Sequence, residues 1–85
     1  MTFIILSKTR CLPCRQAHKM IQHLELDWPT KWYHDDPAFF KKLGIVSVPA
    51  LIKVVGPNEY SIEAIGLPEI KNYITNMNTN RDEEE

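Results

Sequence analysis

The sequence predicts an α/β fold with the element order β-α-β-α-β-β-α, in which helices flank a four-stranded mixed sheet. Short β-branched and apolar segments alternate with segments whose apolar residues recur about every three or four positions, as in helices. Two early strand–helix units favour a parallel core, and two late strands joined by a short turn favour an antiparallel edge. The length of 85 residues fits one domain, expected at residues 1–78, followed by a flexible acidic tail at residues 79–85.

The composition is that of an ordinary globular chain, because 44% of the residues are hydrophobic and 25% are charged. These values argue against a disordered or collagen-like chain. Two cysteines are too few for the disulfide framework of a small secreted protein. The longest apolar run, residues 3–6, is far shorter than the ~20 residues of a membrane-spanning helix. We therefore expect a soluble, cytoplasmic monomer that does not bind membranes.

The net charge of −1 hides an uneven distribution along the chain. The first twenty residues contain no acid and four basic residues, which are Lys8, Arg10, Arg15 and Lys19. This positive charge surrounds the cysteines, whereas residues 21–80 contain seven acids and the last five residues carry a net charge of −3. The basic residues are too few to predict nucleic-acid binding.

The first strand and helix lie on either side of the first cysteine. Residues 2–7 are β-branched and apolar, as in a strand covered on both faces. After Cys11, helical spacing places four apolar residues on one face, namely Ala17, Met20, Ile21 and Leu24. Pro13 fits only in the first turn, where a missing N–H costs no helical hydrogen bond. The helix is therefore expected to begin at Cys11 or Leu12.

The remaining elements are bounded by aspartate, glycine or proline. We expect a strand at 30–34, a short helix at 38–43, strands at 50–55 and 59–65, and a helix that begins near 68. Asp36 before Pro37 is typical of a helix start, and Gly44 is typical of a helix end. The Gly-Pro-Asn sequence at 56–58 favours a turn between the last two strands.

Two cysteines separated by two residues at a helix start can perform redox chemistry. Cys11 would face free backbone N–H groups and the positive end of the helix dipole, both of which favour a thiolate. The basic side chains of Lys8, Arg10 and Arg15 favour the same form. We predict that Cys11 is the nucleophile. Cys14, one turn into the helix and on its apolar side, is predicted to be the buried resolving thiol.

Other roles for the cysteines are less well supported. They could form a structural disulfide or pack as two small hydrophobic residues. With His18 and His23 they also form a C-x2-C-x3-H-x4-H pattern, but a common zinc finger needs about twelve residues between its Cys and His pairs. On one helix the two histidines lie roughly 140° apart. We therefore expect no metal site, and both histidines on the polar face of the helix.

Over residues 2–78 the chain resembles the thioredoxin–glutaredoxin superfamily. The matching features are the strand–Cys11-Leu12-Pro13-Cys14–helix opening, the segment 44–51, and Gly66 before the last helix. The resemblance implies a thioredoxin-like fold with a redox-active Cys11–Cys14 disulfide. It also implies a cis peptide bond at Pro49 beside the cysteines, and a Val48 backbone that pairs with the substrate chain.

The chain combines features of two branches of this superfamily. Pro13, just before the second cysteine, is similar to thioredoxin, whereas the short length is similar to glutaredoxin and to the small redoxins encoded by phages. Thioredoxins have tryptophan where this chain has Arg10, and a buried acid where it has Ile4 or Ile5. Proton transfer must therefore use water or another group. Glutaredoxins that bind glutathione tend to have a Gly-Gly pair and an Asp that caps the last helix, whereas this chain has only Gly66 there.

The resemblance implies a dithiol–disulfide oxidoreductase that reduces protein disulfides and that could donate electrons to ribonucleotide reductase. No bound cofactor is expected, and the electrons would come from a thioredoxin-reductase-type flavoprotein or from glutathione. The residues expected to contact substrate are Lys8, Arg10, Leu12, Pro13, Val48 and Pro49. Two alternatives stay open: a glutathione-dependent glutaredoxin, and a non-catalytic subunit that keeps the redoxin fold for binding.

Overall fold

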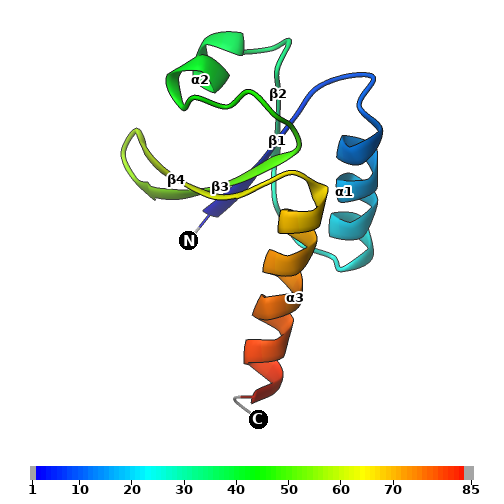
Figure 1. The fold of residues 1–85 in the computed structure, drawn as a ribbon. Helices are drawn as coiled ribbons and strands as arrows, with labels where there is room; N and C mark the ends of the chain where they lie inside the picture. Colours follow the sequence, from blue (N-terminus) through cyan, green and yellow to red (C-terminus); the bar gives the residue numbers. More distant parts are fainter. Residues whose placement is uncertain (1, 84–85) are drawn as a thin grey trace.

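The computed structural model describes residues 2–83, and Figure 1 shows their fold. The chain forms seven elements: β1 (Thr2–Ser7), α1 (Leu12–His23), β2 (Thr30–Trp32), α2 (Pro37–Lys42), β3 (Ala50–Gly56), β4 (Glu59–Ile65) and α3 (Leu67–Glu83). This order is the predicted one. Strand β2 is shorter than expected, because the N–H of Asp35 donates to the carbonyl of Trp32 at 3.1 Å and turns the chain there.

The four strands form one mixed sheet with the order β2-β1-β3-β4. Strand β1 is parallel to β2 and antiparallel to β3, and β3 is antiparallel to β4. The predicted parallel core is therefore limited to β1 and β2. The six-residue helix α2 lies near the end of β2 and does not run back along the sheet, so the chain enters β3 from that same end (Figure 1).

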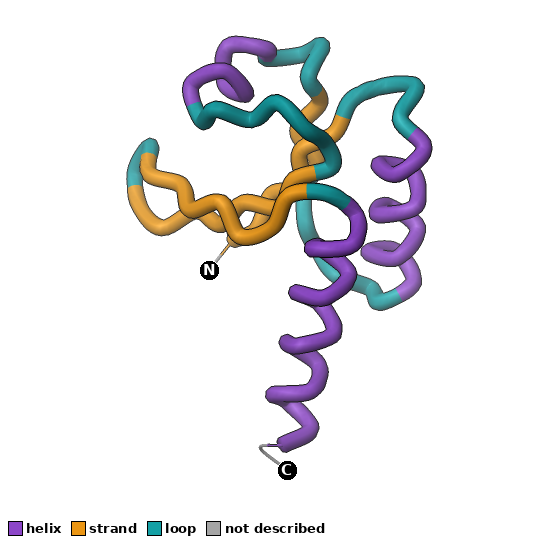
Figure 2. The backbone as a smooth tube through the Cα atoms, in the orientation of Figure 1, coloured by secondary structure: helices purple, strands orange, loops and turns teal. Residues whose placement is uncertain are grey.

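Helices cover both faces of the sheet, as Figure 2 shows. Helices α1 and α3 pack on one face through a cluster made of Ile5, Ile21, Leu51, Ala64, Ile70 and Ile74. Helix α2 and the segment after it cover the other face through Leu6, Phe40, Ile45, Ala50 and Ile52. Neighbouring residues of a strand point to opposite faces. The complete burial of both Ile5 and Leu6 thus confirms that β1 is covered on its two sides.

Short-range interactions fix the start of α1 and both ends of α2. Cys11 is the N-cap of α1, and Pro13 lies in the first turn, as predicted. The carboxylate of Asp36 accepts a hydrogen bond from the N–H of Phe39 at 3.2 Å and caps α2. Gly44 follows α2 with a φ of 71°, a backbone conformation that glycine adopts without a steric cost.

Helix α3 continues to Glu83, so it includes part of the segment expected as a tail at residues 79–85. The flexibility of that segment stays a prediction, and residues 84–85 lie outside the described part of the chain. None of the helices within residues 2–83 combines the length and the apolar character needed to cross a membrane.

Candidate functional site

Cys11 and Cys14 form a disulfide at the N-terminus of α1, with their Cα atoms 5.2 Å apart. The N–H of Cys14 donates a hydrogen bond to the Sγ of Cys11 at 3.2 Å. Cys11 therefore occupies the place where unpaired backbone N–H groups gather and where the helix dipole is positive. After reduction of the disulfide, this environment favours a negatively charged sulfur on Cys11.

The two cysteines differ in exposure in the predicted way. Cys14 is 1% exposed, and it shares the buried side of α1 with Ala17 and Ile21. Cys11 is only half-buried, and the following Leu12 is 63% exposed. A disulfide partner in solution can thus approach the Cys11 end of the pair, whereas Cys14 lies behind it.

The loop before β3 brings Val48 and Pro49 next to the disulfide. The carbonyl oxygen of Val48 lies 4.0 Å from the Sγ of Cys11, and the Val48–Pro49 peptide bond is cis, as the resemblance implied. Pro49 is buried, and its carbonyl accepts a hydrogen bond from the N–H of Gly66 at 2.7 Å. Within residues 2–83 the N–H and C=O of Val48 make no backbone hydrogen bond. The Val48 backbone is therefore open to pairing with another chain.

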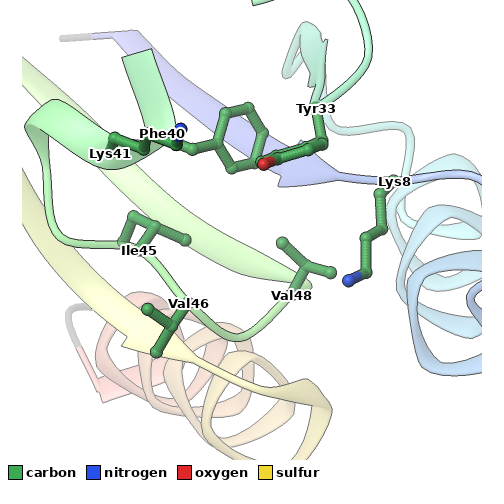
Figure 3. A pocket seen from close by; sticks show the side chains of 7 residues that line it. All are labelled: Lys8, Tyr33, Phe40, Lys41, Ile45, Val46 and Val48. Atoms are coloured by element: carbon green, nitrogen blue, oxygen red, sulfur yellow. The ribbon is translucent and has the colours of Figure 1, made fainter. Parts of the chain in front are cut away.

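A cavity of about 340 Å³ adjoins this loop, as Figure 3 shows. It is lined by Lys8, Tyr33, Phe40, Lys41, Ile45, Val46 and Val48. Most of the lining is apolar or aromatic, and Lys8 and Lys41 add two positive charges. Because Val48 belongs to the cavity wall and also approaches Cys11, the cavity lies beside the disulfide.

The structure places the other predicted contact residues in two groups. Lys8 lines the cavity together with Val48. Arg10, Leu12 and Pro13 are exposed beside the cysteines and are not part of the cavity lining.

Sequence reasoning missed five of the seven residues that line the cavity, which are Tyr33, Phe40, Lys41, Ile45 and Val46. Among them, Tyr33 adds an aromatic ring and Lys41 adds a positive charge to the wall. The sequence gave no sign that these two residues share a site, because Tyr33 follows β2 and Lys41 belongs to α2.

A hydrogen-bonded pair lies between β1 and α1. Ser7 is the fully buried polar side chain within the described residues, and its Oγ lies 2.9 Å from the Nε2 of His18. The imidazole of His18 stacks on the indole of Trp32, with ring centroids 5.4 Å apart. Partial burial lowers the pKa of His18 below its ordinary value, so that the ring is neutral at neutral pH.

The expectation that His18 lies on the polar face of α1 is therefore wrong. His18 follows Cys14 by four residues, a spacing that places both side chains on one face of a helix. The four-residue spacing from Cys14 could therefore have predicted that His18 lies on the buried side of α1. His23 is exposed, as expected.

The described residues contain no group of three or more His, Cys, Asp or Glu side chains arranged to hold a metal ion. The known proteins offer no further guide, because no protein-family model matches the chain and a search of curated proteins finds no match. The small α/β fold with a mixed four-stranded sheet and a Cys-x-x-Cys disulfide is compatible with a thioredoxin-like fold.

Proposed function

We propose that this chain is a thiol–disulfide oxidoreductase of the thioredoxin–glutaredoxin superfamily, which reduces disulfides through Cys11 and Cys14. The observation that carries the proposal is the disulfide at the N-terminus of α1, formed by one half-buried and one buried cysteine. Thiol–disulfide exchange needs an accessible thiolate for the first step and a second thiol held close to it for the next. Cys11 and Cys14 meet these two requirements.

The reaction has two exchange steps. The thiolate of Cys11 attacks a substrate disulfide, so that one substrate sulfur bonds to Cys11 and the other leaves as a thiolate. The sulfur of Cys14 then attacks the Sγ of Cys11. The Cys11–Cys14 bond forms, and the second substrate sulfur leaves with its electron pair. The substrate gains two electrons and two protons, and the cysteine pair becomes oxidised until an electron donor reduces it.

Surfaces around Cys11 favour a protein as the substrate. The N–H and C=O of Val48 make no backbone hydrogen bond within residues 2–83, so they offer the pairing that an extended peptide needs when it adds to a backbone edge. Leu12 is 63% exposed and Val46 is 92% exposed, so apolar surface is available near the disulfide and its neighbouring loop. Ribonucleotide reductase is a protein substrate that the superfamily resemblance suggests.

Trapping the mixed disulfide tests the proposal. With oxidised insulin as substrate, Cys14→Ser should accumulate a covalent complex, because Cys11 can attack but nothing can resolve the product. Cys11→Ser should form no complex and should lose insulin reduction. Full insulin reduction by Cys11→Ser would contradict the proposed roles. Gln16→Ser is a control, because it alters an exposed, uncharged α1 residue near Cys14 while it keeps both thiols.

The cavity beside Val48 favours glutathione as a second candidate partner. Glutathione is a peptide with two carboxylates, and Lys8 and Lys41 give the cavity two positive charges. The volume of about 340 Å³ lies within the range of small-molecule sites. The two donors are separated by measuring reduction of the Cys11–Cys14 disulfide by glutathione and by NADPH with a thioredoxin-reductase-type flavoprotein. The donor that gives the higher rate at matched concentrations identifies the branch.

A non-catalytic binding role makes a different prediction. A subunit that uses the redoxin fold only for binding would keep its biological activity when both cysteines are replaced by serine. The proposed oxidoreductase would lose all activity in that double variant.

A further inference from the structure

The proposed reaction requires Cys14 to lose its proton while it is buried. A thiol must become a thiolate to attack a disulfide, and a low-dielectric environment disfavours the charged form. Cys14 is 1% exposed, so bulk water is a poor acceptor for its proton. A buried group that can accept a proton near neutral pH would remove this barrier.

His18 lies where such a group is needed. It follows Cys14 by one helical turn on α1, and side chains four residues apart on a helix have Cβ atoms about 5–6 Å apart. Helical side chains also lean toward the N-terminus, so the His18 side chain covers the turn that contains Cys14. The contact with the buried Ser7 places the His18 ring on the sheet side of α1, which is also the buried side that Cys14 occupies.

Two contacts hold the imidazole in place. Its Nε2 is 2.9 Å from the Oγ of Ser7, and its face stacks on Trp32. The ring is neutral at neutral pH, because burial disfavours its charged form. Proton transfer from Cys14 requires the tautomer in which Nε2–H donates to the Oγ of Ser7, because Nδ1 is then the unprotonated nitrogen and makes no bond to Ser7.

We propose that His18 accepts the proton of Cys14 during the resolving step and that Ser7 positions its imidazole. This inference rests on the proposed function. The S–H bond of Cys14 breaks, and its proton passes to the unprotonated nitrogen of His18. The Cys14 sulfur bonds to the Sγ of Cys11, and the substrate sulfur leaves as a thiolate. When the disulfide is reduced again, the imidazolium returns the proton to Cys14.

Few other titratable groups surround this ring. On α1 they are Cys14 itself and the exposed Arg15 and Lys19. Just beyond the ends of β1 and β2 they are Lys8, directly after Ser7, and His34, whose ring is 6.1 Å from that of Trp32. His34 is the other histidine near this site, so a His34→Gln variant separates its titration from that of His18.

Two-phase release of a coloured thiol tests the inference. The reduced protein is mixed with an equimolar aromatic disulfide, dithiobis-nitrobenzoate, in a stopped-flow instrument. Attack by Cys11 releases the first nitrothiobenzoate, and attack by Cys14 releases the second in a unimolecular phase. In His18→Gln the second phase should be about 100-fold slower at neutral pH, a common loss on removal of a general base. The first phase should stay within about twofold, because His18 has no part in the Cys11 attack.

The pH profile separates proton transfer from a purely structural role. In the wild type, the rate of the second phase should rise with pH as His18 becomes neutral and then level off. In His18→Gln it should keep rising until the Cys14 thiol itself ionises. His23→Gln, on the exposed side of the same helix, and His34→Gln should both behave as the wild type. Ser7→Ala should slow the second phase less than His18→Gln does.

The outcomes separate this inference from the proposed function. Absence of a second phase in the wild type would contradict the proposed oxidoreductase. A normal wild type together with an unchanged second phase in His18→Gln would overturn only the role of His18. Should His18→Gln not fold, NMR titration of His18 in the wild type decides. We expect its titration curve to differ between the oxidised and reduced protein, and identical curves would overturn the inference.

Discussion

The backbone N–H of Cys14 donates a hydrogen bond to the Sγ of Cys11, with 3.2 Å between nitrogen and sulfur. The more exposed sulfur, that of Cys11, thus accepts the hydrogen bond from the helix N-terminus. Cys14 donates this bond through its backbone, and its own side chain is buried. In the reduced protein, this N–H would favour a thiolate on Cys11. The same short segment therefore gives its two cysteines different surroundings.

We predict that the exposed side chain of Leu12 contributes to binding of protein substrates. Leu12→Ser removes apolar area next to Cys11, so kcat/KM for insulin reduction should fall by about threefold to tenfold. The rate with a small aromatic disulfide should not change. Val55→Ser is the matched control, because Val55 is also exposed but follows Val54, which pairs with Thr2 at the opposite end of β1. Equal losses in both variants would contradict a local binding role.

Lys8 is predicted to attract anionic disulfides to the cavity. Lys8→Gln should lower the rate with glutathione disulfide by about twofold to fivefold at low salt, and the difference should shrink as salt is added. The rate with an uncharged small disulfide should fall less, because that reaction depends on Lys8 only through the Cys11 thiolate. Lys42→Gln removes the same charge from an exposed residue of α2 that is not part of the cavity lining. A similar effect of the two variants would mean that only net charge matters.

Phe40 is predicted to be the main anchor of α2 on the sheet. Its ring is 1% exposed and makes an edge contact with Tyr33 at a centroid distance of 5.3 Å. Phe40→Ala should lower the free energy of unfolding by about 3–5 kcal/mol, measured by urea denaturation of the oxidised protein. Phe40→Leu should cost less, because it fills most of the space. A loss below about 1 kcal/mol for Phe40→Ala would be typical of a surface position instead.

His18 should make stability depend on pH. Its pKa is lowered by burial, whereas in the unfolded chain it returns to about 6.5. Between these two values the unfolded chain binds more protons, so a fall in pH favours unfolding. The contribution of neutral His18 is complete above about pH 6.5 and is lost as the pH falls through the lowered value. Urea denaturation should therefore show a smaller difference between wild type and His18→Gln at acid pH than at neutral pH. An equal difference at both would contradict this burial effect.

The local pattern of the sequence predicted the elements and the cysteine pair well. Pro13 and the apolar spacing after it fixed the start of α1, and the same spacing predicted that Cys14 is buried. Asp36 and Gly44 marked the two ends of α2. These features depend on interactions within a few residues, which is why one sequence suffices to find them.

Features that depend on packing between elements were harder to predict. Apolar patterns show that a strand is buried but not its direction, so the antiparallel pairing of β3 with β1 was missed. The contact of His18 with Ser7 joins residues that are close only because α1 packs on β1. Likewise, Tyr33 and Lys41 meet at the cavity through the packing of α2 and its neighbouring loop.

The central claim, that Cys11 is an accessible and activated thiolate, is tested most directly by alkylation of the reduced protein. The rate of reaction with iodoacetamide is measured from about pH 5 to about pH 9 in Cys14→Ser, in Cys11→Ser and in free cysteine. The account predicts that Cys14→Ser reacts much faster than free cysteine at about pH 6 and that Cys11→Ser reacts more slowly. A Cys11 thiol no faster than free cysteine at that pH would contradict it.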